Sequence, residues 1–310
     1  MCYSARILAD YRRYVRMFGA NASLRDFVDL FLRRQSDPEA RIVIPKGVEE
    51  AFADPQSDAE RAAKQAIDAF RAQQATKFEQ ELFKQRKRLA DAERTLATKT
   101  TKAAHQSKRI AGEKVEWLLG KLSSLRSPDL DDDDLRIFPG HYAPVMVVED
   151  GRRVVKPMRY QCRPPGKPPN WDSKYPGTYN ARRDNLEGEF WRGLFGRSHG
   201  ILVIQGFYEH VKRDGENVIL EFHPRPDQDM LVACLWSRWT APRQPELLSF
   251  AAITDEPPTE IAAVGHDRCV IPIQPEDVDA WLNPDPANLA ASYAILDNRP
   301  RPYYEHRLAA

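Results

Sequence analysis

The sequence predicts an α+β protein, and two contrasting stretches support that fold class. From Gln56 to Ala111 the chain has neither glycine nor proline, and its alanine, glutamine, lysine and glutamate content favours helix. Beyond about Ile137 lie 20 of the 24 prolines, together with β-branched runs separated by turn residues. We therefore expect long helices in the first half of the chain and a β-rich core in the second.

The earliest predicted helix lies in the stretch SLRDFVDLFLRR. Ser23 is a suitable N-terminal cap, because its hydroxyl can accept a hydrogen bond from a free backbone amide. Phe27, Leu30 and Phe31 then form an apolar stripe at helical spacing, which predicts an amphipathic helix.

The long helical stretch carries a heptad-like seam of Phe78, Leu82, Leu89 and Leu96, flanked by the basic run KQRKR. Threonines and polar residues in LATKTTKAAHQSKR interrupt the seam, so a turn, break or frayed end is expected there. A second helix is predicted in GEKVEWLLGKLSSL. This pattern predicts a hairpin or arm, although the seam could instead pair with a partner or with a second copy of the chain. The long helices are expected at about 57–97 and 112–125.

Turn residues and β-branched runs predict the strands of the second half. Two hairpins are expected, one around Asp150-Gly151 and one around Asp214-Gly215, because Asp-Gly suits a two-residue connection. Further strands are predicted in MLVACLW, LLSFAAI and RCVIPI. The stretch PEDVDAWL opens with Pro275 and acidic residues, which favours a short helix.

Composition excludes several classes of protein. The 310 residues are 42% hydrophobic and 29% charged, and no apolar run approaches the roughly 18 residues of a membrane span. The polar N-terminus lacks the apolar centre of a signal peptide. The four cysteines are far apart and form no C-x-x-C pair, which argues against a zinc cluster and a disulfide framework. We expect a cytoplasmic protein with no metal, no cofactor and no membrane partner. The cysteines are Cys2, Cys162, Cys234 and Cys269.

Charge is unevenly distributed along the chain. The net charge is only +1, but residues 58–121 contain 15 Lys or Arg against 9 Asp or Glu. That segment therefore carries +6 and the remainder −5. An electrostatic arm that binds phosphate backbones is one interpretation, and a solvated hairpin packed on the core is the other.

Polar residues stand beside apolar sequence at several points of the β-rich half. Asn180 and Arg182 follow a loop in TYNARRDN, Glu209 stands in QGFYEH, and His266 and Arg268 precede a strand in VGHDRCVIPI. Asparagine can orient a carbonyl, a buried glutamate can move a proton, and histidine titrates near neutral pH. Together with a cysteine nucleophile these residues would make a reactive site.

The nucleophile is suggested by the first residues, because Cys2 directly follows the initiator Met1. Removal of Met1 would leave an α-amine of pKa about 8 beside a thiol of pKa about 8.5, and both groups are nucleophilic near neutrality. Amine and aldehyde give a Schiff base, and the thiol then closes a five-membered thiazolidine. An internal cysteine has no free amine on its own carbon skeleton and cannot do this.

These residues resemble the SOS response-associated peptidase (SRAP) family, the abasic-site processing proteins. The family opens with Met-Cys, here Met1-Cys2, and carries a Y-N-x-A-P motif, here the divergent HYAPV. It has N-A-R, here Asn180 to Arg182, then a G-(W/F)-(F/Y)-E-(W/H) strand, here Gly206 to His210. HDRCVIP and PEDVDAWLN match later family segments. The resemblance covers Met1 to about Arg6 and roughly Phe138 to Asn283.

The resemblance implies an SRAP-like mixed sheet or barrel core with short helices, and a long helical insertion after the first strand. The implied division is 1–10 and 137–310 for the core and 11–136 for the insertion. The implied partner is single-stranded DNA with abasic sites, including replication-fork DNA, which places the protein at the nucleoid. Its implied activity is a covalent thiazolidine crosslink to the abasic-site aldehyde, beside the autopeptidase step for which the family is named. Only Met1 precedes the cysteine here.

The resemblance also implies a role for each site residue. Cys2 would be the nucleophile, and Asn180 would orient its backbone and the sugar. Glu209 would move the proton that opens the deoxyribose ring, and His266 would assist proton transfer and reversal of the crosslink. Arg182 and Arg268 would hold flanking phosphates through charge-assisted hydrogen bonds.

The sequence departs from the family pattern in ways that keep two other functions open. Tyr3 and Ser4 replace the usual Gly-Arg after the cysteine, the tryptophan-containing segment reads MRYQCRP, and the C-terminal segment differs. One alternative is a non-catalytic single-stranded DNA-binding protein. The other is a cysteine amidohydrolase or autopeptidase that uses Cys2 with His266.

Overall fold

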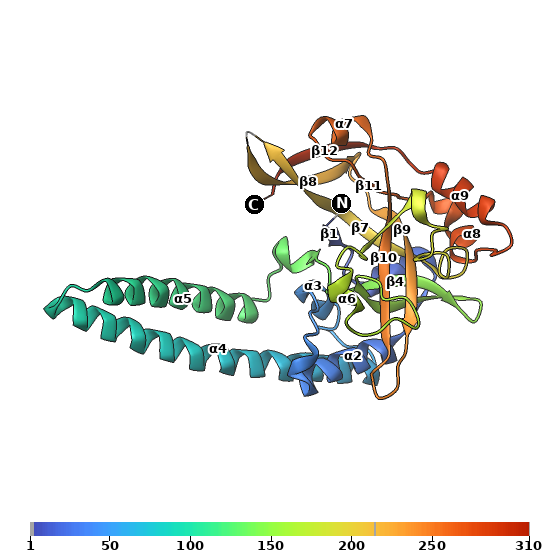
Figure 1. Cartoon of the computed structure of the whole chain (residues 1–310). Coiled ribbons are helices and arrows are strands. Elements are labelled where there is room, and N and C mark those ends of the chain that lie inside the picture. The colour runs from blue at the N-terminus through green and yellow to red at the C-terminus, as the bar shows by residue number, and fades with distance from the viewer. Residues whose placement is uncertain (1–2, 214, 310) are drawn as a thin grey trace.

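The computed structural model describes residues 3–213 and 215–309, and it shows an α+β fold with a projecting helical hairpin (Figure 1). The β-rich core holds a sheet in which all the strands of the described residues are joined. The strands are β1 Ser4–Ile7, β2 Asn21–Ala22, β3 Arg136–Ile137, β4 Tyr142–Glu149, β5 Arg152–Tyr160, β6 Asn180–Arg182, β7 His199–Arg213, β8 Glu216–Arg225, β9 Met230–Trp239, β10 Leu247–Asp255, β11 Cys269–Val270 and β12 Tyr303–Leu308. The α-helices are α1 Tyr11–Phe18, α2 Leu24–Ser36, α3 Lys46–Glu50, α4 Asp58–Thr98, α5 Lys102–Arg126, α6 Trp171–Lys174, α7 Thr259–Ala263, α8 Val278–Leu282 and α9 Leu289–Asp297.

Strand pairing confirms the expected barrel-like core. β10 pairs with β5, β5 with β4, β4 with β7, β7 with β9, and β9 with β10 again. These pairings form a closed circuit, so the five strands share no free edge. The remaining strands extend it: β1 and β8 pair with β7, β6 and β11 with β10, β3 with β1, β2 with β5, and β12 with β8.

The hairpin around Asp150-Gly151 is confirmed, and its turn shows why those residues are needed. β4 and β5 pair antiparallel up to Glu149 and Arg152. Asp150 and Gly151 both have positive φ, 51° and 72°, as a type I′ turn requires. β7 and β8 form the second predicted hairpin; of its turn residues, Asp214 lies outside the described residues. Pro275–Asp277 and α8 form the predicted short helical segment, as a 3-10 turn followed by an α-helix.

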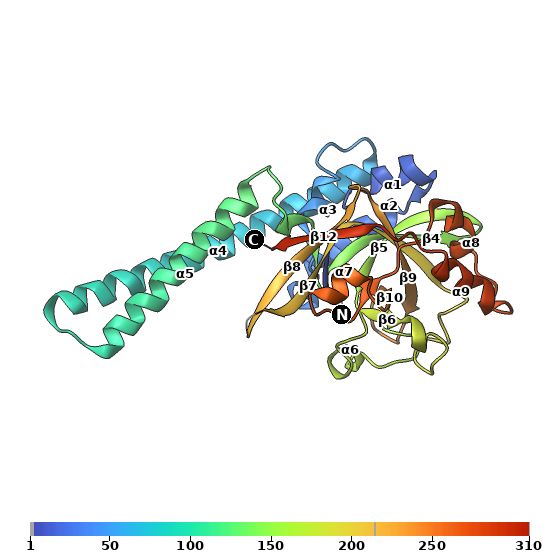
Figure 2. The same cartoon turned by 90° about the horizontal axis from the view of Figure 1, so that it is seen from above.

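α4 and α5 lie antiparallel and project together from the core (Figures 1 and 2). The first half of the predicted seam packs inside this hairpin, where Leu82 and Phe78 join Leu118 and Leu122 in a small apolar cluster; Leu89 and Leu96 are not part of that cluster. The prediction of 112–125 for the second helix was too short, because α5 begins at Lys102. Thr101 caps it: its hydroxyl oxygen accepts a hydrogen bond from the Ala104 amide at 3.1 Å. The polar stretch is therefore helical after a turn at 99–101.

The segment between β1 and α4 packs on the β-rich core. Tyr14, Phe27, Phe31 and Phe52 are all fully buried in the main apolar cluster, together with strand residues. Ser23 stands at the N-terminus of α2 as predicted, but its hydroxyl donates to Asp26 at 2.7 Å and does not cap the backbone. The division into 1–10, 11–136 and 137–310 stays a prediction, and this packing favours a narrower insertion that consists of α4 and α5.

Core helices and the barrel meet around His199, whose hydrogen bonds fix its tautomer. The Gly196 amide donates to Nε2 at 2.9 Å, so Nδ1 carries the proton and donates to the Trp281 carbonyl at 3.0 Å. The imidazole stacks on the Trp281 ring at 3.9 Å. Burial lowers the pKa of His199 to about 4.

Acid should therefore destabilise the fold through His199. Its pKa of about 4 lies below its ordinary value of 6.5, so the unfolded chain binds more protons and stability falls as pH drops from about 6.5 to 4. Between pH 7 and pH 5 we expect a loss of roughly 2 kcal/mol from this group. Urea unfolding across this range measures it. His199→Gln, which cannot titrate, should show a shallower pH dependence; an unchanged slope would contradict the assignment.

Candidate functional site

β7 organises the candidate site, because it pairs with β1 on one side and with β8 and β9 on the other. Ser4 of β1 lies opposite Tyr208, one residue before Glu209. Gly206 is required by this close packing: a Cβ there would lie 2.9 Å from the carbonyl oxygen of Phe222 in β8. Cys2 lies outside the described residues. The described chain reaches the site at Tyr3.

Tyr3 packs in an aromatic cluster that touches both polar segments. Its ring lies edge-on to the rings of Tyr179 at 5.8 Å, His210 at 6.0 Å and Phe138 at 5.9 Å. Tyr179 directly precedes Asn180 in the chain, and His210 directly follows Glu209. The start of the described chain is therefore anchored between the segments that carry these two candidate residues.

Glu209 and His266 form a buried pair. Oε2 of Glu209 lies 2.9 Å from Nε2 of His266, and the side chains are 0% and 8% exposed. Nδ1 of His266 lies 2.8 Å from the carbonyl oxygen of Arg268. With a proton on Nδ1, this contact is a hydrogen bond to the carbonyl; the Arg268 amide also lies 3.4 Å from Nδ1 and donates to it in the other tautomer. A proton between Nε2 of His266 and Oε2 of Glu209 makes the contact between these two atoms a hydrogen bond. The pair is therefore suited to hold and pass a proton.

A glycine turn delivers His266 to β7. The helix α7 ends at Ala263, and Gly265 follows with φ of +91°. The Gly265 amide donates to the carbonyl of Ala262 at 2.9 Å, and the His266 amide to that of Ile261 at 3.4 Å. These two bonds are those of a Schellman motif, which requires a left-handed residue at the position of Gly265. The turn at Gly265 thus ends the helix, and the His266 side chain that follows contacts Glu209 of β7.

Asn180 lies at the start of β6, parallel to β10 and opposite Ala252. Its side chain is buried, and Oδ1 lies 3.4 Å from the hydroxyl of Tyr160. The ring of Tyr160 is held in turn against Tyr179 at 5.7 Å and stacked on Phe250 at 5.2 Å. The amide is therefore fixed by aromatic side chains that also contact the Tyr3 cluster.

Arg182 and Arg268 meet at Asp184, a residue that the sequence prediction omitted. Nε of Arg182 donates to Oδ1 of Asp184 at 2.9 Å, and Nη2 of Arg268 lies 3.8 Å from Oδ2. The Arg182 guanidinium lowers the pKa of Asp184, and the carboxylate raises the pKa of Arg182. Arg182 is half exposed and Arg268 is mostly buried. One carboxylate thus holds both cations on one side of β6.

The prediction also omitted the aromatic residues and Arg136. The Arg136 guanidinium lies 3.7 Å from the centre of the Tyr208 ring and donates to the Ser4 hydroxyl at 3.0 Å, which secures β1. Tyr3 and Ser4 stood out in the sequence only as departures from a motif. The structure gives both a packing role.

The three cysteines of the described residues are buried, and the described side chains form no metal site. Cys162, Cys234 and Cys269 are free and buried, and burial raises the pKa of each thiol. Within residues 3–213 and 215–309, no group of three or more His, Cys, Asp or Glu side chains is arranged to hold a metal ion. Over the same residues, no helix has both the length and the apolar character needed to cross a membrane.

Comparisons with known proteins point to one family. The sequence profile described as SOS response associated peptidase (SRAP) matches residues 94–306, from the last turns of α4 into β12. The matched range therefore includes Asn180, Glu209 and His266 but not Cys2. No protein of curated function matches the chain.

Three solved structures resemble the chain at low identity. A protein from Bordetella bronchiseptica has a TM-score of 0.49 at 18% identity, over 59% of this chain and 90% of that one. A protein from Bacteroides thetaiotaomicron has a TM-score of 0.48 at 15% identity, over 57% and 78%. A phage-related protein from Bordetella bronchiseptica has a TM-score of 0.44 at 19% identity, over 60% and 85%.

The Glu209–His266 pair should stabilise the fold as a coupled unit. His266→Ala removes the imidazole from a fully buried carboxylate, so we expect a loss of about 3 kcal/mol in unfolding free energy. A double-mutant cycle with Glu209→Gln should give a coupling of roughly 1–3 kcal/mol by urea unfolding.

The exposed His105 of α5 provides the control, since His105→Ala should leave stability within about 0.5 kcal/mol of the wild type. Additive effects of His266→Ala and Glu209→Gln would contradict the pairing.

Proposed function

The chain belongs to the SOS response associated peptidase (SRAP) family, and from this premise we propose that it binds single-stranded DNA and crosslinks abasic sites through Cys2. The product would be a thiazolidine formed from the Cys2 amine and thiol and the ring-opened sugar aldehyde. Family membership supports a function in the DNA-damage response, and the proposal adds a specific reaction at Cys2.

The observation that carries the proposal is the position of Tyr3. Its ring contacts the direct sequence neighbours of both Asn180 and Glu209, and Cys2 is bonded to Tyr3 through a single peptide bond. Consecutive Cα atoms lie about 3.8 Å apart across a trans peptide. Cys2 therefore lies one residue from Tyr3 along the chain, and the proposal places its α-amine and thiol beside the Glu209–His266 pair.

The proposed reaction balances without a cofactor. The Cys2 α-amine attacks the C1′ aldehyde of the open-chain sugar, and the resulting carbinolamine loses one water to give an imine. The thiolate then adds to the imine carbon, and the nitrogen takes up the proton that the thiol released. One C–N and one C–S bond form and the carbonyl oxygen leaves as water, so neither an oxidant nor a reductant is needed.

The buried pair supplies proton transfer. An abasic sugar is mainly a closed hemiacetal, so its ring oxygen must gain a proton and its C1′ hydroxyl must lose one before an aldehyde exists. Glu209 would move these protons, and His266, 2.9 Å away, would hold the proton in exchange. His266 would also return a proton to the sulfur or nitrogen when the crosslink reverses. Asn180, fixed by Tyr160, would orient the N-terminal backbone and the sugar.

Arg182 and Arg268 would hold the phosphates on either side of the lesion. Each guanidinium can make charge-assisted bonds to phosphate oxygens. Asp184 already shares the two cations, and its negative charge would keep the arginines in place before DNA binds. Exchange of this carboxylate for phosphate would cost part of the binding energy.

A crosslinking assay with reductant tests the proposal. Native protein with Met1 removed should form a heat-stable adduct with a single-stranded abasic oligonucleotide, without reductant, on a denaturing gel. Cys2→Ala keeps an α-amine but has no thiol, so its adduct should be seen only after borohydride reduction of the Schiff base. An intact oligonucleotide should give no adduct.

Protein that retains Met1 behind an N-terminal tag provides the matched control, because its cysteine has a thiol but no free amine. It should bind DNA and form no adduct. Equal crosslinking by tagged and native protein would sink the aminothiol mechanism, while binding without any crosslink would leave a non-catalytic DNA-binding protein.

Glu209→Gln should slow capture without weakening DNA binding. Glutamine keeps the shape of the side chain but cannot move a proton, so we expect crosslink formation to slow by about 100-fold. Single-turnover crosslinking rates and fluorescence anisotropy measure the two quantities. An unchanged rate would remove Glu209 from the proposed chemistry.

A further inference from the structure

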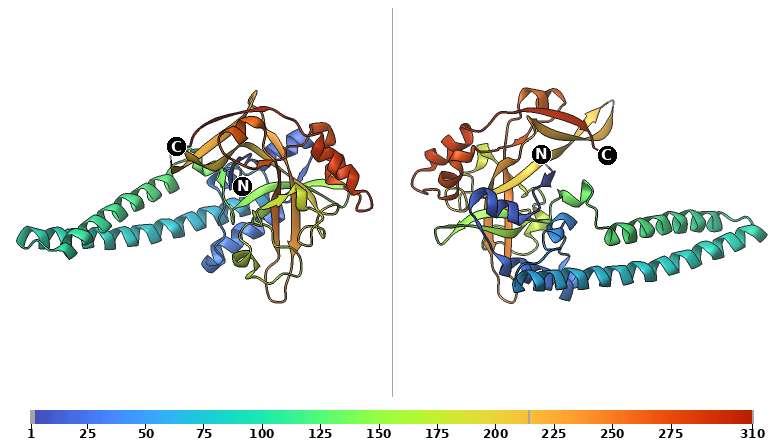
Figure 3. Two further views of the ribbon diagram at one scale, coloured as in Figure 1. Left: turned by 45° about the horizontal axis from the view of Figure 1, so that its top comes forward. Right: turned by 180° about the vertical axis from the view of Figure 1, so that it is seen from behind.

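The hairpin of α4 and α5 is rooted on the core at one end. Arg71 of α4 forms ion pairs with Glu49 at 2.6 Å and Glu50 at 2.7 Å, and the Arg34 guanidinium lies 4.1 Å from the centre of the Phe70 ring. Beyond these contacts the two helices extend away from the β-rich core, as views from several sides show (Figure 3). Residues 77–121 make up this projecting part.

The net positive charge of residues 58–121 comes entirely from the projecting part. Residues 58–76 contain three basic and three acidic side chains and are neutral. Residues 77–121 contain 12 basic and 6 acidic side chains, and so carry the entire excess of six charges. The charge therefore increases where the hairpin leaves the core, which packing alone does not require.

Five cations lie along one side of the hairpin, which we call the basic face. They are Lys77, Lys84 and Arg88 of α4, and Lys114 and Lys121 of α5. Spacings of seven and four residues keep each set on one side of its helix. Contacts join the two sets. Arg88 donates to the Ser107 hydroxyl at 2.9 Å, and the Phe78 and Trp117 rings meet at 6.1 Å.

Trp117 sits between the lysines of α5 on this face. The ammonium of Lys114 lies 3.8 Å from the centre of its ring and that of Lys121 lies 5.9 Å away. Trp117 remains 47% exposed. A cation held over an aromatic ring keeps its full charge and can still bind an anion.

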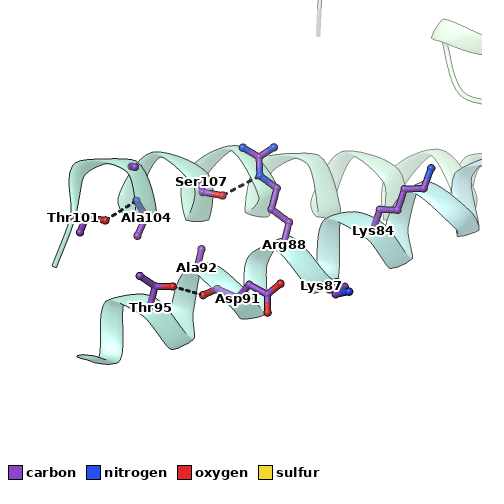
Figure 4. A pocket seen from close by; sticks show the side chains of 10 residues that line it. Lys84, Lys87, Arg88, Asp91, Ala92, Thr95, Thr101, Ala104 and Ser107 are labelled. Carbon is purple, nitrogen blue, oxygen red and sulfur yellow. Dashed lines mark hydrogen bonds between the residues drawn. The ribbon is translucent and has the colours of Figure 1, made fainter. Parts of the chain in front are cut away.

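Toward the tip, the basic face continues as a groove between the two helices (Figure 4). Lys84, Lys87, Arg88, Thr101 and Ser107 line it. Ammonium, guanidinium and hydroxyl groups are donors for phosphate oxygens. Asp91 is the acidic residue in the groove, and Arg94 already contacts it at 3.2 Å.

On the opposite face of the hairpin, two ion pairs join the helices. Glu93 of α4 pairs with Lys108 of α5 at 3.1 Å, and Glu79 pairs with Arg126. The carboxylates of α4 thus satisfy cations of α5 on that side. On the basic face, Glu81 lies 4.0 Å from Lys84. The two faces of the hairpin therefore differ in charge, and the basic face is the more positive.

We propose that the basic face binds the phosphate backbone of double-stranded DNA beside the single-stranded site. The projecting part of α4 spans about 33 Å at 1.5 Å per residue. Duplex DNA of this length has about ten base pairs, so cations spaced along the hairpin can lie beside several phosphates of one duplex. The inference rests on the proposed function only in taking DNA as the polyanion.

Two variants of equal charge test the basic face. The face variant carries Lys77→Gln, Lys84→Gln and Lys114→Gln, and the control variant carries Arg86→Gln, Lys102→Gln and Lys108→Gln in the same hairpin. Fluorescence anisotropy measures binding of each to a 20-base-pair duplex, a single strand and a junction of the two, across a salt series. Circular dichroism checks that both hairpins remain helical.

We expect the face variant to lose about tenfold or more in duplex and junction affinity, and its salt slope to fall by about 1 for each lysine removed. The control variant should bind duplex within about twofold of wild type. Equal losses in the two variants, no loss in either, or a loss confined to the single strand would overturn the proposal. Crosslinking to a single-stranded abasic oligonucleotide should be unchanged in both, so failure of the Cys2 chemistry is detected separately.

Discussion

A carboxylate with no exposed surface sits in the middle of β7, and this burial constrains the surrounding structure. An isolated buried charge is costly, so Glu209 requires groups that hold or share its proton. His266 is one such group, and its position depends on the Schellman turn at Gly265. The pair therefore couples a strand of the barrel to a loop more than fifty residues later in the chain. A buried pair of a carboxyl group and an imidazole is the kind of group that the proposed acid–base chemistry uses.

The barrel strand β7 holds Glu209 of this pair in place, and β1, which pairs with β7, places the start of the described chain beside the same strand. β7 is long enough to pair with β9 in its first half and with β8 in its second, while β1 lies along its other edge. Arg136 secures β1 through Ser4, and Tyr3 is held by three rings. The hairpin of α4 and α5 contributes none of these contacts. The charge of the hairpin therefore calls for an explanation separate from the site.

Much of this fold could be predicted from local sequence, because local rules decide it. The Asp150-Gly151 turn, the seam at Leu82 and the helix after Pro275 follow from backbone preference and periodicity, and each is present. The start of α5 was missed because the threonines and lysines around Thr101 resemble a loop in sequence. The hydrogen bond from the Ala104 amide to the Thr101 hydroxyl shows that a helix begins there. Asn180, Glu209 and His266 were singled out from the sequence, but the 2.9 Å contact between the last two depends on strand register and chain reversal. Asp184 was missed because the run from Arg182 to Asp184 gives no sign that Arg268, from a later segment of the chain, lies close to the same carboxylate.

The central claim is that the free amine and thiol of Cys2 are the atoms bonded to the lesion. Tryptic digestion of the crosslinked complex followed by tandem mass spectrometry locates the adduct directly, since cleavage after Arg6 releases a peptide that begins at Cys2. This peptide should gain the mass of the sugar fragment less one water, with the modification on Cys2 itself. An adduct on a lysine, or on any of the three buried cysteines, would contradict it.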